Sequence, residues 1–104
     1  MKPAICTSFD YNLPFPEAVA LIAAAGFEVV ALGGRPGHSG YATTEGRAGI
    51  RRLMEEHGLT VDSVHAPFPE GDRLFSLDDA ERAESVRLCQ LVMDAASELE
   101  SRTV

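Results

Sequence analysis

Hydrophobic positions fall into short runs that alternate with segments of helical spacing. The short apolar runs near residues 3–7, 27–32 and 60–65 are rich in residues that favour strands and predict three β-strands. The run at 27–32 is apolar apart from Glu28, which is the pattern of a strand covered on both faces. The sequence therefore predicts a sheet of at least three strands.

Three segments between and after these runs carry apolar residues on one helical face. They predict helices at Phe15–Ala25, at about Thr44–His57, and from a cap at Ser76 or Asp78 to about Glu100. The order is thus β-α-β-α-β-α, which is typical of a parallel sheet with right-handed crossovers and strands side by side in chain order.

The connections differ strongly in length at the two ends of the predicted strands. The segments Ser8–Pro14, Gly33–Gly46 and Pro67–Leu77 follow the strands and are predicted to be long loops, whereas the returns from helix to strand are one or two residues. In (β/α) barrels, the loops that follow the strands meet at one rim and build the functional site. The fold class predicted is therefore α/β, with the first three (β/α) units of such a barrel.

The chain has 104 residues, and a complete (β/α)8 barrel takes about 250. We therefore expect residues 1–104 to form one partial, truncated barrel domain, with the start of a fourth strand near residues 102–104. A self-contained three-stranded unit is the alternative. In an isolated fragment, the sheet face opposite the helices would expose Ile5, Val29 or Val30, and Val64, which predicts a homo-oligomer.

His65 is the most informative candidate for a functional residue. It ends a run of β-formers and is followed closely by Pro67, which cannot continue a sheet ladder, so it should lie at the carboxyl end of a strand. His38, in the glycine-rich segment with Tyr41, is the second candidate for substrate or metal binding. Either histidine could instead be structural or simply solvated, and His57, beside the end of a helix, is expected to be structural.

Composition and charge argue against nucleic-acid-binding and membrane-spanning classes of protein. The net charge is −7, and the basic residues are scattered, which argues against nucleic-acid binding through a basic face. The longest apolar run, Ala18–Ala25, is too short to cross a membrane, and no signal-peptide pattern follows Met1. Cys6 and Cys89 lie in apolar segments without a CxxC motif, so we expect reduced thiols and a cytoplasmic protein.

Three stretches together resemble the first three units of xylose-isomerase-like barrels. They are Ala24–Val30, Leu53–Val61 and Ser63–Phe68, and the His-Ala-Pro sequence at residues 65–67 is the most specific part. This superfamily contains sugar and sugar-phosphate isomerases and epimerases, inosose dehydratases and zinc-dependent apurinic-site endonucleases. The resemblance covers nearly the whole chain and implies a sugar-metabolising barrel of which this chain is the amino-terminal part.

The resemblance implies chemistry that this chain holds only in part. In the isomerases and epimerases, a divalent metal (Mn, Mg, Co or Zn) binds two sugar oxygens, and two glutamates from later strands move a proton. His65 matches a third-strand histidine that contacts the substrate, or zinc in the nucleases. The fragment alone is expected to be inactive and free of metal, with a small sugar as the substrate of a complete parent.

Two alternatives stay open. One is a stand-alone, non-catalytic half-barrel that assembles with itself or with a partner chain. The other is a metal hydrolase like the apurinic-site endonucleases. The second is weakened because many relatives end strand 2 with an acidic residue, whereas this chain has Val30-Ala31-Leu32.

Overall fold

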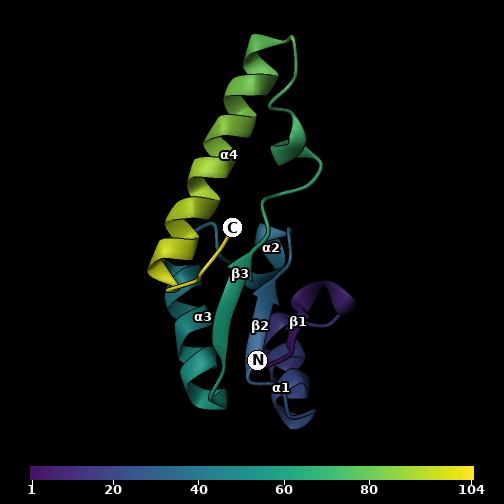
Figure 1. Cartoon of the computed structure of the whole chain (residues 1–104), viewed down its shortest axis with the longest axis vertical. Helices are drawn as coiled ribbons and strands as arrows, with labels where there is room; N and C mark the ends of the chain where they lie inside the picture. The colour runs from purple at the N-terminus through teal and green to yellow at the C-terminus, as the bar shows by residue number, and fades with distance from the viewer.

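A three-stranded parallel sheet forms the centre of the chain, as the sequence predicts (Figure 1). The computed structural model describes all residues 1–104. The strands are β1 (Ala4–Cys6), β2 (Val29–Leu32) and β3 (Thr60–Val64), in the order β1-β2-β3. Each strand lies within its predicted range, and the parallel pairing confirms the α/β fold class.

Helices fill the segments between and after the strands. In chain order they are the 3-10 turn η1 (Thr7–Phe9), α1 (Phe15–Ala24), α2 (Pro36–Ser39), α3 (Thr44–His57), the 3-10 turn η2 (Glu70–Asp72) and α4 (Asp79–Glu98). The short helix α2 was not predicted, because the glycine-rich segment around it has too few apolar residues for a helical pattern. It ends at Gly40, whose φ of 89° suits a residue without a side chain.

Local signals explain where the two longer helices begin. The Thr43 hydroxyl accepts a hydrogen bond from Gly46 N at 2.9 Å and caps α3, and Asp78 caps α4 by accepting from Glu81 N at 2.9 Å. Helix α3 ends at Gly58, which has a φ of 65°. The boundaries therefore follow from capping residues that are visible in the sequence.

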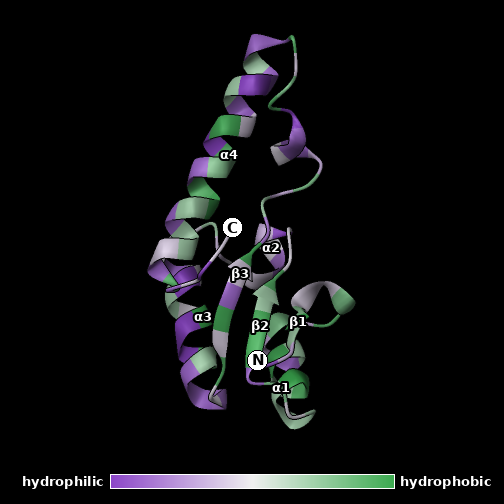
Figure 2. Cartoon of the chain, viewed as in Figure 1, coloured by the Kyte–Doolittle hydropathy of each residue, from purple (hydrophilic) through white to green (hydrophobic).

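The hydrophobic core lies between the sheet and the helices (Figure 2). It joins side chains from two strands, from α1 and α3 and from the last turns of α4. Its members that are at most 2% exposed are Val19, Ile22, Val30, Leu32, Tyr41, Ile50, Val64, Val92 and Ala95. Each large apolar side chain buried here contributes about 1.5–3 kcal/mol to folding.

A β-bulge changes which side chains of β3 face this core. The register pairs Val30 with Val61, Ala31 with Ser63 and Leu32 with Val64, so Asp62 is an extra residue. Val61 and Val64 therefore both face the helices although they are three positions apart, whereas Ser63 and His65 fall on the other face. Bulges of this kind are known to re-aim side chains next to functional sites.

The structure overturns part of the expectation for the open face of the sheet, and at Val64 the bulge is the reason. Val64 is fully buried against the helices and Ile5 packs against the core, so neither lies on the open face as expected. Of the alternatives Val29 and Val30, Val30 is fully buried and Val29 alternates with it to the open face. The sequence pattern assumed unbroken alternation along β3, which the extra residue removes. The open face carries Val29 together with small side chains that include Cys6 and Ala31.

After α4 the chain returns to the outer edge of β3. Arg102 N and Thr103 N donate to Asp62 O at 3.0 and 3.2 Å, and Val64 N donates to Thr103 O at 3.2 Å. Ser63 and Thr103 form a parallel bridge. Residues 102–104 therefore lie where the fourth strand of a barrel would pair, and they use the carbonyl that the bulge exposes.

Candidate functional site

A cavity of about 480 Å³ opens at the carboxyl ends of the three strands, the ends that carry the arrowheads in Figure 1. We call it the rim cavity. Its lining comes from the segments that follow β1, β2 and β3, and consists of Cys6, Ser8, Tyr11, Gly33, Gly34, Arg35, His65 and Phe68. The three loops predicted to meet at one rim thus do so, and His65 is among them.

The His65 ring presents one free nitrogen to this cavity. His65 Nδ1 lies 2.6 Å from the Ala66 carbonyl oxygen. A carbonyl oxygen can only accept, so Nδ1 carries the proton and, in the neutral ring, Nε2 carries a lone pair. Nε2 has no partner within the chain and can accept a hydrogen bond from a hydroxyl group or bind a cation.

The backbone of His65 is fixed from two sides. His65 N donates to Leu32 O at 2.9 Å, and the Tyr41 hydroxyl donates to His65 O at 3.0 Å. Tyr41 is fully buried, and burial, with a smaller contribution from Tyr11, raises the pKa of Tyr41 to about 12. The Tyr41 hydroxyl therefore remains a proton donor across the physiological pH range.

Two glycines let the end of β2 approach the neighbouring segments. A Cβ atom at Gly34 would lie 2.7 Å from Ala66 O and 2.8 Å from His65 Nδ1, and one at Gly33 would collide with the Tyr11 hydroxyl. Gly33 N also donates to the hydroxyl of buried Thr7 at 3.0 Å. Side chains at these positions would displace the rim, so the glycines are required for close approach.

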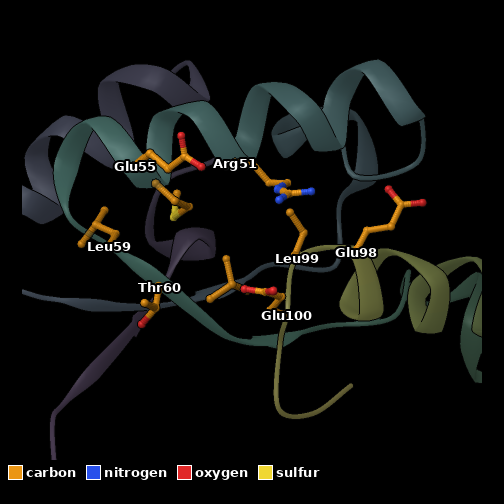
Figure 3. Close-up of a pocket in the computed structure, with 9 residues that line it drawn as sticks. Arg51, Glu55, Leu59, Thr60, Glu98, Leu99 and Glu100 are labelled. Carbon is orange, nitrogen blue, oxygen red and sulfur yellow. The ribbon is translucent and has the colours of Figure 1, made fainter.

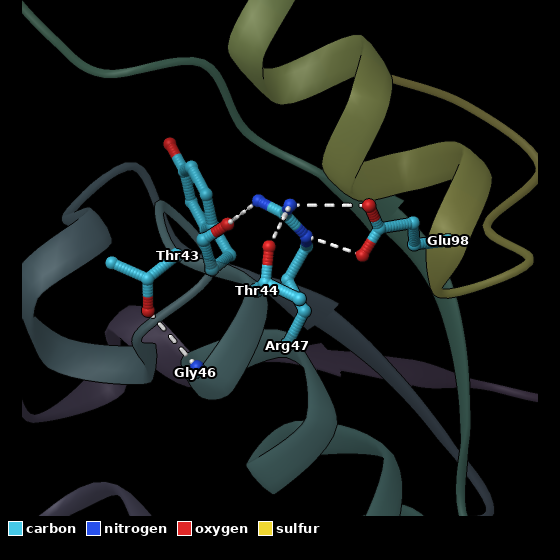
Figure 4. Close-up of polar contacts among 6 residues, drawn as sticks. Thr43, Thr44, Gly46, Arg47 and Glu98 are labelled. Carbon is cyan, nitrogen blue, oxygen red and sulfur yellow. Dashed lines mark hydrogen bonds and ion pairs between the residues drawn. The ribbon is translucent and has the colours of Figure 1, made fainter.

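A buried arginine ties this region to the helices (Figure 4). Arg47 is 8% exposed and forms a two-point ion pair with Glu98, with Nε–Oε2 at 2.5 Å and Nη2–Oε1 at 3.1 Å. Its Nη1 donates to Tyr41 O at 3.0 Å. The guanidinium thus connects α3 and α4 to the residue that holds His65, a two-point geometry that a lysine could not reproduce.

Sequence reasoning did not identify the roles of Arg47 and Glu98. They are separated by 51 positions, and each has the local pattern of an exposed helix residue. Tyr41 was noted only as a neighbour of His38. A single aromatic residue in a glycine-rich segment was the only available signal for it.

The structure does not bring His38 together with His65. His38 Nε2 lies 2.7 Å from Leu13 O, and its ring stands edge-on to Tyr11 and Phe15, with centroid distances of 5.2 and 5.7 Å. It does not line the rim cavity. Its other nitrogen, Nδ1, is buried without a partner. These contacts fix the first long loop against α2.

The residues of this chain do not by themselves fit a divalent metal ion. No group of three or more His, Cys, Asp or Glu side chains is placed to hold one. Within the rim cavity, the side chains of the metal-ligating types are the His65 imidazole and the Cys6 thiol. The Cys6 sulfur accepts a hydrogen bond from the Ser8 hydroxyl at 3.0 Å. A divalent cation needs more ligands than these, and we derive no step through one.

A second hollow lies on the helical layer, at the amino end of β3 (Figure 3). It has a volume of about 200 Å³ and separates α3 from the end of α4. The charged side chains that line it are those of Arg51, Glu55, Glu98 and Glu100. The amino end of the strands in an α/β barrel is associated with stability rather than with chemistry, so we place the functional site at the rim.

Comparisons with known proteins support the fold. No family profile matches the sequence, and no curated protein matches it. The structure is similar to D-psicose 3-epimerase solved in the presence of D-fructose, with a TM-score of 0.72, 20% identity, and coverage of 97% of this chain and 35% of that one. It is also similar to D-psicose 3-epimerase from Clostridium cellulolyticum H10 solved with D-tagatose, with a TM-score of 0.74, 16% identity and coverage of 96% and 35%.

This chain corresponds to about one third of each epimerase. The chain spans 35% of the length of either epimerase, which corresponds to about three of eight (β/α) units. Helices, a parallel sheet and the order of elements all agree, whereas the identity is low. The chain therefore has the fold of the amino-terminal part of a sugar-epimerase (β/α) barrel, as the resemblance in sequence implied.

Proposed function

We propose that this chain is the amino-terminal part of a metal-dependent isomerase or epimerase of sugars or sugar phosphates, and that His65 contacts the substrate. The observation that carries the proposal is the free Nε2 of His65 in a cavity at the carboxyl ends of the strands. In (β/α) barrels, this rim is where substrates bind. The likeness of the fold to two D-psicose 3-epimerase structures supports a sugar as the substrate.

In this proposal the chain binds and orients but does not complete the reaction. His65 Nε2 accepts a hydrogen bond from a sugar hydroxyl, and Tyr11 and Ser8 offer further hydroxyl groups in the same cavity. Moving a proton between neighbouring sugar carbons requires a general acid and base at the reacting carbon. No carboxylate lines the rim cavity, so we assign that pair, and the remaining metal ligands, to the rest of the barrel.

The test compares the 104-residue chain with the longer reading frame, if one exists. We expect no interconversion of D-fructose and D-psicose by the chain alone, and Mn²⁺- or Co²⁺-dependent interconversion by the longer protein. In the longer protein, His65→Gln should lower kcat/KM by at least about tenfold, since a buried hydrogen bond to the substrate is lost. His57→Gln is the matched control, because His57 lies at the end of α3, away from the rim.

Two results would contradict this proposal. Turnover by the 104-residue chain above a blank would show that its site is complete. Equal activity of the His65→Gln and His57→Gln proteins would show that His65 does not contact the substrate. A change in thermal stability is not expected for either variant, because His65 is exposed and its side chain contributes little to the core.

A non-catalytic assembly is the second candidate function, and one observation favours it. Phe68, Phe75 and Leu77 are 66%, 93% and 98% exposed, which is unusual for side chains of this size. Self-association would cover them. Sedimentation at micromolar concentration distinguishes the two cases, since a strictly monomeric chain would contradict a self-assembling half-barrel.

A further inference from the structure

The rim cavity has no acidic side chain in its lining, although the chain is acidic. The chain as a whole carries a net charge of −7, but no Asp or Glu lines this cavity. Its charged or titratable nitrogen groups are the Arg35 guanidinium and the His65 imidazole. An acidic protein thus presents a neutral to positive surface at the place where a substrate would enter.

Arg35 differs from most arginines of the chain in having no acidic partner. Five arginines form ion pairs with carboxylates, namely Arg47, Arg73, Arg82, Arg87 and Arg102. The other two unpaired arginines, Arg51 and Arg52, lie on α3 within one turn of Glu55 and Glu56. Arg35 therefore combines a free guanidinium with a position at the rim cavity.

The Arg35 guanidinium is nevertheless held in place. Its central carbon lies 4.5 Å above the centre of the Tyr11 ring, and the Tyr11 ring is in turn packed edge-on against His38. This contact uses the π face of Tyr11, and no N–H group of the Arg35 side chain donates a hydrogen bond within the chain. The backbone nitrogens of Gly34 and Arg35 also donate no hydrogen bond within the chain.

We propose that the substrate of the rim cavity is a sugar that carries an anionic oxygen group, either a phosphate monoester or a carboxylate, and that Arg35 is the residue that selects it. This inference rests on the proposed function, which provides the sugar. A planar guanidinium with free N–H groups binds two oxygens of such an anion at once. Backbone N–H donors beside it add to the recognition of negative charge.

The inference separates this chain from the two structural neighbours, which were solved with the uncharged sugars D-fructose and D-tagatose. With uncharged sugars, Arg35 would remain without a charged partner. With an anionic sugar, charge-assisted hydrogen bonds would form at the edge of the cavity while His65 meets a hydroxyl. Arg35 would then be a specificity-determining residue rather than a catalytic one.

The test is a titration of the 104-residue chain followed by two-dimensional ¹H–¹⁵N NMR. The ligands are inorganic phosphate, D-fructose 6-phosphate, D-fructuronate and D-fructose. We expect D-fructose 6-phosphate or D-fructuronate to bind at least about tenfold more tightly than D-fructose, with shifts at Gly33, Gly34 and Arg35. Phosphate alone should shift the same amides, and added salt should weaken that binding.

Variants assign the effect to one side chain. Arg35→Ala should remove the preference for the anionic ligands, and Arg35→Lys should restore only part of it, since a lysine lacks the planar two-point geometry. Arg52→Ala is the matched control and should behave as the unmodified chain, because Arg52 is an unpaired arginine that does not line the rim cavity. The ratio between the phosphorylated and carboxylated ligands shows which anion the site prefers.

The outcomes separate this inference from the proposed function. Equal affinity for D-fructose and both anionic sugars, with shifts at the rim, would overturn the role of Arg35 and leave the sugar site standing. Phosphate binding without any sugar-dependent shift at His65 would overturn both the anionic sugar substrate and the proposed function. An unchanged preference in the Arg35→Ala chain, or no shift with any anion, would also overturn the inference.

Discussion

The two halves of α4 show two different ways of holding a helix. The carboxyl half packs Val92, Ala95, Ala96 and Leu99 into the hydrophobic core. The amino half extends beyond the sheet, where it meets only η2 and the loop around it (Figure 1). We call the projecting part, residues 67–88, the arm. One continuous helix thus belongs to the core at one end and to a projection at the other.

Polar contacts rather than apolar burial hold the arm. The Ser85 hydroxyl donates to Gly71 O at 2.7 Å and accepts from Arg73 N at 3.1 Å, and Glu81 binds both Arg73 and Ser76, at 2.7 and 2.8 Å. The Glu81 contacts are exposed to water, where they contribute little, whereas the Ser85 hydroxyl is buried. The comparison teaches that the arm should open locally at a lower free energy than the core.

The largest expected effect on stability comes from a substitution in the hydrophobic core. Leu32→Ala removes a fully buried side chain from β2 and should lower the free energy of unfolding by about 2–5 kcal/mol. Urea denaturation followed by circular dichroism measures it. Leu32 belongs to the hydrophobic core, which contains no residue of the arm. Amide exchange in the arm should therefore change far less than in the strands.

Alkaline pH should lower the free energy of unfolding because Tyr41 is buried in the core. The pKa of Tyr41 is raised from 10.0 to about 12 in the folded chain, so below pH 10 both folded and unfolded states keep the proton and the stabilisation is complete. Between pH 10 and 12 only the unfolded state loses the proton, and stability falls by up to about 3 kcal/mol. Tyr41→Phe should lack this fall, and Tyr11→Phe is the control that should retain it. Identical unfolding curves at pH 8 and 11.5 for the unmodified chain would contradict the assignment.

A change in the arm should separate local from global stability. Ser85→Ala leaves Gly71 O and Arg73 N without their partner and should weaken the arm by about 1–2 kcal/mol. Hydrogen exchange should rise at residues 71–85 with little change in β2 and β3. A uniform rise over the whole chain would show that arm and core unfold as one unit.

The smallest effect on folding is expected at the tip of the arm. Leu77 is 98% exposed, so Leu77→Ser should change the free energy of unfolding by less than about 0.5 kcal/mol. The same substitution should weaken any self-association through the arm, which sedimentation measures over a range of concentrations. Unchanged self-association would place the contact between copies elsewhere on the molecule.

The fold could be predicted to this extent because its signals are local. The caps at Thr43 and Asp78 and the left-handed Gly58 mark helix ends within a few residues, and apolar period separates strands from helices. The rim position of His65 followed from Pro67 in the same way. The short helix α2 escaped because its four residues carry no periodic pattern.

The remaining features depend on contacts between distant residues. The Arg47–Glu98 pair and the Tyr41–His65 hydrogen bond join positions that are 51 and 24 residues apart. The placement of Arg35 over Tyr11 likewise requires the first two loops to be next to each other. A single sequence contains no signal for such pairings. The glycine-rich context of His38 likewise does not distinguish a site residue from a structural one, because its contacts are with Leu13, Tyr11 and Phe15, at least 23 positions away.

The bulge at Asp62 determines on which face of the sheet the residues after it lie. In a regular strand, each added residue exchanges the two sides of the sheet for the residues downstream. The bulge leaves Asp62 unpaired and prevents this exchange, so His65 stays on the face opposite to that of Val61. If Asp62 were instead paired in an unbroken ladder, simple alternation from Val61 would turn the His65 imidazole toward the helices, with no change in the chemistry of the histidine itself. The bulge, and not the number of residues along β3, therefore determines which face carries the histidine, and a change that straightens the strand would remove the ligand site without altering His65.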